Sequence, residues 1–200
     1  MSRVHLDAER WAVVKQEPLR GPLGWLRVWL RRSRAQRSAA GRRALAAAGL
    51  EAPGLLDVIR RPGRLLTVWE HVPGETLQAA WSTADRARQA ELALATARFT
   101  ARLHAAARTR DLKPANLVAT VLDALVLVDL DDVQPGRSER AERVRNLASL
   151  DAYGQRAEPP LGVGARWRAL RAYCEASELE PRALAREVLA ASRAKRAAWG

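Results

Sequence analysis

Residues 84–107 form a long alanine-rich segment, and this segment constrains the fold more than any other part of the chain. Its apolar side chains recur at helical spacing: Leu92, Ala95, Phe99, Leu103 and Ala106. We predict one helix of about 36 Å, long enough to be the central rod of a helical lobe. A polar loop, 108–116, follows it and leads into two short apolar runs, 117–121 and 124–129, which predict a hairpin.

The remaining segments divide into a first part with strands and a second part of helices. Strands are predicted over 11–15, 55–59 and 64–72, with a helix over 23–48. Further helices are predicted over 138–151, 163–177 and 181–198. This order predicts an α+β fold in which a small sheet with one helix precedes a mostly helical part.

The composition excludes several classes of protein. Hydrophobic residues make up 48% and charged residues 28%, as in a globular domain. No apolar run is long enough to span a bilayer, and the N-terminal residues lack the apolar core of a secretory signal. A single cysteine, Cys174, excludes a disulfide framework and a cysteine zinc cluster. We therefore expect a cytoplasmic protein with Cys174 packed in a core.

The formal net charge is +12, from 34 basic and 22 acidic residues. Such a charge favours anionic partners: nucleic acid, phosphorylated substrates or an acidic membrane surface. However, only Lys15, Lys113 and Lys195 are lysines, so 34 − 3 = 31 of the basic residues are arginines. A GC-rich genome also produces such a composition, and both causes stay open. Nucleic acid ranks last among the partners, because no binding motif is present and aromatic residues are only 5%.

Three oxygen-bearing side chains stand out in the loop and the hairpin. Asp111 and Asn116 lie in the loop, and Asp129 ends the second apolar run. A hairpin can bring all three to one end of a small sheet. Converging carboxylate and amide oxygens suit magnesium, which completes its coordination shell with phosphate and water. Each residue alone would be an ordinary turn or strand-end residue, but the joint pattern predicts a site for magnesium and phosphate.

At these residues the sequence resembles the protein-kinase-like superfamily. RDLKPANLV looks like its catalytic loop, and VLVDLDD like the strand and magnesium-binding Asp that follow. Within the superfamily it most resembles the bacterial lipopolysaccharide kinase family, which includes the Kdo and heptose kinases. LRVWLRRSRAQRSAAGRRALAAAGLEAP resembles that family's helix and its exit, LLTVWEHVPGETL its hinge, and RVRNLASL a downstream helix, with Asn146 where Asp is usual. The resemblance covers about residues 11–198.

The resemblance implies a two-lobed protein-kinase-like fold, with a reduced N-lobe over 1–72 and a helical C-lobe over 73–200. It implies transfer of a phosphoryl group from ATP, with Mg²⁺, to a sugar hydroxyl, as in the core of lipopolysaccharide. Lys15 matches the strand lysine that meets the α- and β-phosphates. The backbone of Glu70 and Val72 matches the hinge that holds adenine.

The same resemblance assigns roles to the loop and hairpin. Asp111 matches the catalytic aspartate that orients the acceptor hydroxyl and accepts its proton. Lys113 matches a loop lysine that neutralises the transferring group, and Asn116 and Asp129 match the metal ligands. The partners implied are a nucleotide and a sugar or glycolipid acceptor.

Two parts of the kinase pattern are missing. VHLDAERWAVV, which ends just before Lys15, contains no glycine, whereas kinase-like folds have two strands and a glycine-rich loop there. Either a first strand is lost through a misassigned gene start, or the chain is a compact variant that holds phosphate differently. No acidic residue lies between Glu17 and Glu51, and Ser38 stands where a helix glutamate would pair with the lysine. We therefore expect Lys15 to lack its usual partner, which leaves its orientation unsupported.

These departures leave other functions open. A catalytically weak or inactive pseudokinase scaffold accounts for the missing glycine loop and glutamate. An aminoglycoside- or choline-type phosphotransferase shares the Asp-x-x-x-x-Asn loop. The acceptor pocket has no portable sequence signature, so the loop motif does not separate these acceptors.

A basic helix with tryptophans is predicted in GPLGWLRVWLRRSRAQR. Trp25 and Trp29 share one face and arginines another, so the helix either packs on the small sheet or lies on a membrane interface. The second interpretation places the protein on the cytoplasmic face of the inner membrane. Elsewhere, we expect His104 to serve packing, and Trp167 and Trp199 to be core or lobe-capping aromatics.

Overall fold

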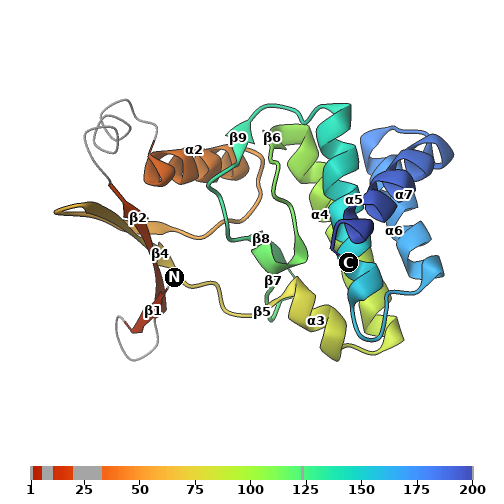
Figure 1. Ribbon diagram of the computed structural model, residues 1–200, viewed down its shortest axis with the longest axis horizontal. Coiled ribbons are helices and arrows are strands. Elements are labelled where there is room, and N and C mark those ends of the chain that lie inside the picture. The colour runs from red at the N-terminus through yellow and green to blue at the C-terminus, as the bar shows by residue number, and fades with distance from the viewer. Residues whose placement is uncertain (1, 6–10, 20–32, 123, 200) are drawn as a thin grey trace.

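The computed structural model describes residues 2–5, 11–19, 33–122 and 124–199. Trp25 and Trp29 lie outside these residues, so the membrane interpretation of their helix stays a prediction. Figure 1 shows a small sheet with helix α2 at one end of the molecule and a bundle of helices at the other. The predicted α+β fold with a small sheet and a helical part is thus confirmed, whereas the boundary at residues 72 and 73 stays a prediction.

A four-stranded antiparallel sheet, in the order β1-β2-β4-β3, begins the fold. Its strands are β1 (Ser2–His5), β2 (Trp11–Pro18), β3 (Leu55–Arg61) and β4 (Arg64–Glu70). Leu65, Thr67 and Trp69 are buried and alternate with more exposed residues, so one face of β4 packs inward. The turn from β3 to β4 uses Gly63, whose φ of +71° is readily adopted only by glycine.

Helix α2 (Arg34–Ala47) packs beside this sheet and against the chain that follows the hairpin. Ser33 caps it through a reciprocal pair of bonds with Gln36. Its buried residues lie on one face: Ala35, Ser38, Gly41 and Leu45. A Cβ atom at Gly41 would lie 2.8 Å from the Cβ of Val133, so glycine permits this close approach.

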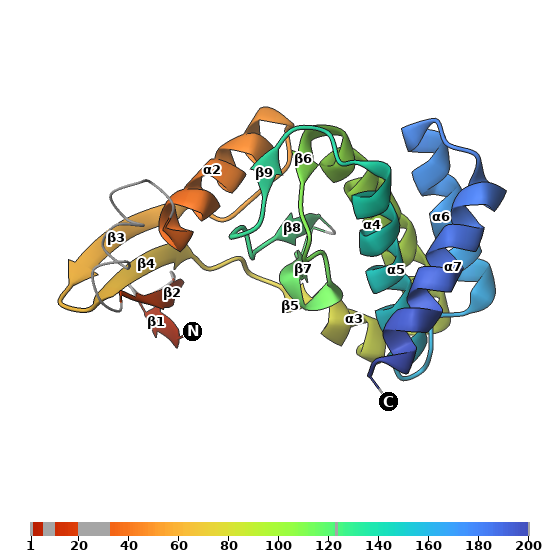
Figure 2. The same cartoon turned by 45° about the horizontal axis from the view of Figure 1, so that its top comes forward.

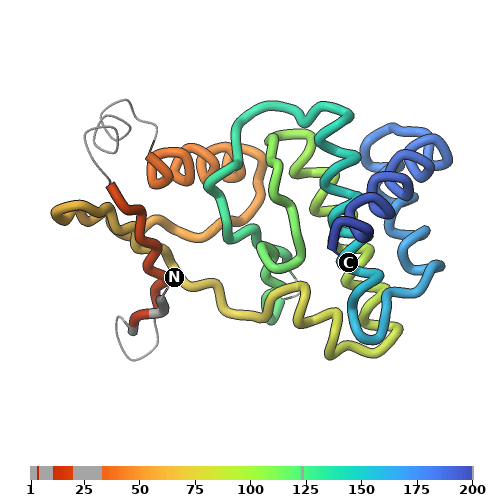
Figure 3. Tube along the Cα trace, in the orientation of Figure 1, coloured from red at the N-terminus to blue at the C-terminus, as the bar shows by residue number. Residues whose placement is uncertain are grey.

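Two smaller sheets connect the halves. Strands β5 (Glu75–Thr76), β7 (Leu117–Ala119) and β8 (Leu125–Leu127) form an antiparallel sheet in that order. Strand β6 (Ala107–Arg108) pairs with β9 (Gln134–Pro135). Figure 3 shows the chain running from β4 to β5 as one extended segment between the two parts. Gly74 in this segment has φ +139°, and a Cβ there would lie 2.2 Å from the carbonyl oxygen of Ala119.

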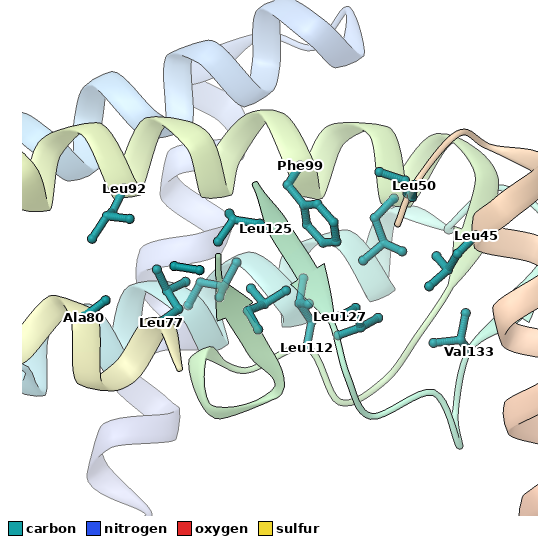
Figure 4. Packing of buried hydrophobic residues seen from close by; sticks show 14 of the residues in the cluster. Leu45, Leu50, Leu77, Ala80, Leu92, Phe99, Leu112, Leu125, Leu127 and Val133 are labelled. Carbon is teal, nitrogen blue, oxygen red and sulfur yellow. The ribbon is translucent and has the colours of Figure 1, made fainter. Parts of the chain in front are cut away.

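The helical part consists of α3 (Leu77–Thr83), α4 (Arg86–Ala106), α5 (Arg140–Arg156), α6 (Val163–Ser177) and α7 (Pro181–Ala197). In Figure 2, α4 and α5 lie between the hairpin and the outer helices α6 and α7. Figure 4 shows Leu92 and Phe99 of α4 near Leu125, and Leu112 near Leu127, in one core. The long helix therefore provides one wall of the core that supports the loop and the hairpin.

The predicted elements are present with shifted ends. The long helix begins after its N-cap Asp85, whose carboxylate accepts the Arg88 N–H, because α3 is a separate short helix before it. The hairpin is confirmed, with three residues in each strand. The strand predicted to reach Val72 ends at Glu70. Of the helix predicted over 23–48, the described part spans α2 alone.

Two packing predictions have different outcomes. Cys174 is fully buried, as predicted, and burial raises the pKa of its thiol to about 11. Trp167 is 40% exposed, so of the two predicted roles the core one is wrong, and the role of a lobe-capping aromatic stays a prediction. Among the described residues, no helix is long and apolar enough to cross a bilayer.

Candidate active site

The polar loop between α4 and β7 is fixed from both sides. Asn146 of α5 donates from Nδ2 to the Thr109 carbonyl oxygen at 2.9 Å. The Arg110 backbone N–H donates to the Asp132 carboxylate. Leu112 is only 1% exposed and anchors the loop in the core. Asn146 stands where the kinase pattern has Asp, and an ionised carboxylate there would have no hydrogen to donate to Thr109.

Asp111, Lys113 and Asn116 form one hydrogen-bonded group in this loop. The Lys113 Nζ atom lies 2.7 Å from the Asp111 Oδ2 atom, and Asn116 Nδ2 donates to the same oxygen at 3.2 Å. Asn116 Nδ2 also donates to the Asp111 carbonyl oxygen at 3.1 Å. The hydrogen bond and charge of Asp111 are the main causes that raise the pKa of Lys113. The loop thus presents a carboxylate with an ammonium beside it.

The hairpin places Asp129 next to this group. The Val128 N–H donates to the Asn116 carbonyl oxygen at 2.9 Å, which joins the end of β8 to the start of β7. Asp129 is the next residue, and its Oδ1 atom lies 2.9 Å from the Nζ atom of Lys15 on β2. Lys15 thus lacks the usual helix glutamate, as expected, but Asp129, 114 residues away in the sequence, orients it instead.

These residues border a cleft of about 570 Å³ between the sheet and the hairpin. Five of the seven predicted site residues line it: Lys15, Glu70, Val72, Asn116 and Asp129. Asp111 and Lys113 are not part of this lining, but Asp111 is bonded to Asn116 at its edge. Val13 and Trp69 add apolar walls on the side of the sheet. The cleft therefore combines apolar walls with the Lys15 ammonium and with oxygen-bearing side chains that include Asn116 and Asp129.

Glu70, the last residue of β4, and His71, the residue after it, both form hydrogen bonds to other parts of the chain. The Glu70 N–H donates to the Gly54 carbonyl oxygen at 2.8 Å, and the Glu70 carboxylate accepts the Gly54 N–H at 3.1 Å. The His71 N–H donates to the Trp11 carbonyl oxygen at 3.0 Å. Val72 follows, and its backbone N–H has no hydrogen-bond partner within the described residues. This N–H is available for a ligand in the cleft.

Asp131 is a residue of the cleft that the sequence analysis did not single out. Ser38 donates its hydroxyl to the Asp131 carboxylate, and Arg34 donates from Nε at 2.5 Å. Arg37 donates to the Asp131 carbonyl oxygen at 3.3 Å. The hydrogen bond to Asp131 is also the main cause that raises the pKa of Arg34. The signal was present in the sequence, because Arg34, Arg37 and Ser38 have the spacing of one helix face.

Asn116 and Asp129 fit a magnesium ion by the chemistry of their free atoms. Because Asn116 uses Nδ2 to donate to Asp111, its Oδ1 atom remains as an acceptor, and the residue lines the cleft. Asp129 uses Oδ1 for Lys15, and its side chain is 35% exposed. Hard oxygen ligands of this kind are those magnesium takes, with phosphate and water completing its shell. In the described residues, no group of three or more His, Cys, Asp and Glu side chains forms a metal site elsewhere.

The combination of elements defines the class of fold. An antiparallel sheet with one flanking helix is followed by a long helix, a polar loop and a hairpin that ends in Asp, with a cleft between sheet and hairpin. This is the protein-kinase-like fold that the resemblance predicted.

Comparison with solved structures supports the same fold. The chain is similar to an aminoglycoside-3′-phosphotransferase of type VIII, with a TM-score of 0.63 and 17% identity, over 94% of this chain and 92% of that one. It is similar to the bifunctional kinase-methyltransferase WbdD, with a TM-score of 0.54 and 18% identity, over 92% of this chain and 42% of that one. At these identities the likeness concerns the fold alone. No family model and no curated protein matches the sequence.

Proposed function

We propose that the chain is an ATP- and Mg²⁺-dependent phosphotransferase that phosphorylates a sugar hydroxyl, as in the core of lipopolysaccharide. One observation carries this proposal: Lys15, Asn116 and Asp129 line a single cleft, and Asp111 is bonded at its edge. Phosphoryl transfer depends mainly on positioning and on neutralising charge. A base, two lysines and a metal site supply these requirements.

Each residue has a role that follows from its position. The Lys15 ammonium, now on Asp129, would exchange this carboxylate for the phosphates of the nucleotide. Asp111 would accept the proton of the acceptor hydroxyl. The oxygen of that hydroxyl would bond to the γ-phosphorus while the bond between the γ-phosphorus and the ADP oxygen breaks. Lys113 would neutralise charge on the transferring group. Magnesium, held by Asn116 and Asp129, would supply further charge neutralisation at the phosphates.

The hinge would hold the adenine ring. The carbonyl of Glu70 and the N–H of Val72 offer one acceptor and one donor at the cleft, which matches the edge of adenine. Val13 and Trp69 would cover its faces. Such a reaction uses cytoplasmic ATP, so we place the protein in the cytoplasm, at the inner membrane if the acceptor is a glycolipid.

An inactive pseudokinase scaffold is the second candidate. The absence of the helix glutamate favours it, because Lys15 takes as its partner Asp129, the residue that the reaction would need for magnesium. The intact loop favours activity, since Asp111, Lys113 and Asn116 keep their mutual bonds. The choice between the two depends on turnover.

ATP turnover with magnesium tests the proposal. Asp111→Asn should reduce kcat by about 10²–10⁴-fold, the usual contribution of a general base. Asp129→Asn should raise the magnesium concentration needed for half-maximal turnover. Asp57→Asn, an exposed carboxyl on β3, is the matched control and should retain wild-type turnover. The same background turnover in wild type and both site variants would show that the chain is a scaffold.

A further inference from the structure

Two ion pairs line the cleft, and only the first has a role in the proposed reaction. Lys15 of β2 pairs with Asp129 at 2.9 Å, and Arg34 of α2 pairs with Asp131 at 2.5 Å. The two carboxylates belong to one short segment, where the buried Leu130 separates them. The hydrogen bond and charge of Asp131 are the main causes that raise the pKa of Arg34, and the charge of Asp129 adds to them. The two pairs are therefore close enough to act on one ligand.

The backbone and the side chain of Arg34 are both held in place. Its backbone N–H donates to the carboxylate of Glu17 at 2.9 Å, and Glu17 lies two residues after Lys15 on β2. Its Nε and Nη2 atoms both lie 2.5 Å from the same oxygen of Asp131. The hydroxyl of Ser38, one turn further along α2, donates to the other oxygen of Asp131. These contacts orient the guanidinium group before any ligand binds.

The guanidinium of Arg34 retains donors for a ligand in the cleft. A guanidinium has five N–H donors, and the contacts with Asp131 use the Nε and Nη2 atoms. The Nη1 atom has no hydrogen-bond partner in the part of the chain that the structure describes. The side chain of Arg34 is 55% exposed, whereas that of Asp131 is 15% exposed. An oriented and accessible guanidinium favours an anion with several oxygen atoms, such as a phosphate group.

The contact between α2 and Asp131 accounts for both missing parts of the kinase pattern. Ser38 stands at the position of the helix glutamate, and α2 presents the guanidinium of Arg34 to the cleft instead. A carboxylate at position 38 would lie against the carboxylate of Asp131, and two like charges in contact repel each other. The segment before Lys15 contains no glycine, so a glycine-rich loop does not supply its phosphate contacts. A cation from α2 can supply them.

We propose that Arg34 binds the terminal phosphates of the nucleotide, in place of the contacts that a glycine-rich loop makes. The proposal rests on the proposed phosphotransferase function and adds a phosphate-binding residue to it. Asp131 holds the Nε and Nη2 edge of the guanidinium, and the Nη1 atom donates to phosphate oxygens. The terminal phosphates are the ones that magnesium bridges, and Arg34 lies near the magnesium ligand Asp129. Lys15 and Arg34 thus neutralise the phosphate chain together.

Equilibrium binding to the whole chain in the presence of Mg²⁺ tests this contact. Isothermal titration measures the affinity for ATP, and saturation-transfer NMR measures the affinity for adenosine, which has no phosphate. Arg34→Gln should weaken ATP binding about tenfold, the loss expected from one charge-assisted hydrogen bond, and leave adenosine binding unchanged. Arg34→Lys keeps the charge without the forked donors and should lose less. The matched control is Arg43→Gln, which removes an exposed arginine from the opposite side of α2 and should bind both probes as wild type does.

A double variant separates a direct phosphate contact from an indirect effect of charge. Without Arg34, the carboxylate of Asp131 has lost its cation and would itself repel the phosphates. Arg34→Gln combined with Asp131→Asn removes both charges and should still bind ATP about tenfold less tightly than wild type. Wild-type affinity for ATP in the double variant would overturn the proposal. Equal losses of ATP and adenosine binding in Arg34→Gln would also overturn it, because the variant would then have disturbed the whole cleft.

Turnover of ATP separates this proposal from the proposed function. Turnover that depends on Asp111, together with ATP binding that does not depend on Arg34, overturns the phosphate contact and retains the phosphotransferase. ATP binding that depends on Arg34, without any turnover, supports the phosphate contact and overturns the phosphotransferase. A wild-type chain that does not bind ATP overturns both.

Discussion

The buried imidazole of His104 makes the stability of this protein depend on pH in a calculable way. His104 is fully buried at the end of α4, where its Nδ1 atom lies 2.9 Å from the Tyr173 hydroxyl and its Nε2 atom 3.0 Å from Asn146 Nδ2. Because Asn146 donates with Nδ2, Nε2 is the acceptor and Nδ1 carries the proton. Burial, and then the charge of Arg143, lower the pKa of His104 from 6.5 to about 3.

Because the pKa of His104 is lowered on folding, acid destabilises the folded protein. Below pH 6.5 the unfolded chain binds a proton at His104 that the folded chain does not bind until about pH 3. Within this window the free energy of unfolding falls by about 1.4 kcal/mol per pH unit from this residue alone. The expected loss between pH 8 and pH 5 is about 2 kcal/mol, since the first half-unit below the unfolded pKa contributes only in part.

Urea unfolding of wild type and His104→Gln at pH 8 and pH 5 measures this loss. Glutamine keeps one donor and one acceptor but does not titrate, so the wild type should lose about 2 kcal/mol more than the variant. Tyr173→Phe is the control, because it removes one hydrogen bond and retains the imidazole. It should be less stable than wild type at both pH values. Its free energy of unfolding should fall between pH 8 and pH 5 by as much as that of wild type. Equal losses in wild type and His104→Gln would refute the reasoning.

Three further predictions concern packing and reactivity. Gly41→Ala should lower the free energy of unfolding by about 1–3 kcal/mol through overpacking. Gly164→Ala, whose Cβ would meet nothing within 4 Å, is the control and should not lower it. Urea titrations of the two variants and the wild type measure the difference. Asp131→Ala should lower the free energy of unfolding by about 1–3 kcal/mol, because the buried Ser38 hydroxyl of α2 loses its acceptor. A thermal melt unchanged from that of Asp57→Ala would contradict this. Cys174, with its pKa near 11, should react with DTNB far more slowly in the native protein than in urea; rapid native labelling would contradict its burial.

Local patterns in the sequence predicted most elements because their causes are local. The alanine-rich helix follows from apolar residues at helical spacing, and its start follows from the cap at Asp85. The polar loop and hairpin follow from a short motif whose residues lie close together in the chain. Asp111, Lys113 and Asn116 could be proposed as one group for the same reason, and they share hydrogen bonds in the structure.

Local patterns failed where an element's surroundings decide the outcome. Val163, Trp167 and Cys174 have the spacing of one face of α6, yet Cys174 is fully buried whereas Trp167 is 40% and Val163 74% exposed. Periodicity identifies which side chains share a face, but not whether another element covers that face. The strand predicted over 64–72 ends at Glu70, although the His71 N–H still donates to the Trp11 carbonyl oxygen in the register of β2 and β4.

Sequence alone therefore predicted the protein-kinase-like fold and the grouping of the loop residues, because both depend on residues near one another in the chain. Only the tertiary structure decided which charges meet. Lys15 pairs with Asp129 across 114 residues, and Ser38 meets Asp131 across 93. Tyr153 and Trp199 come together only because α5 and α7 end side by side. Contacts over such separations depend on how elements pack, and no spacing within a single segment encodes them.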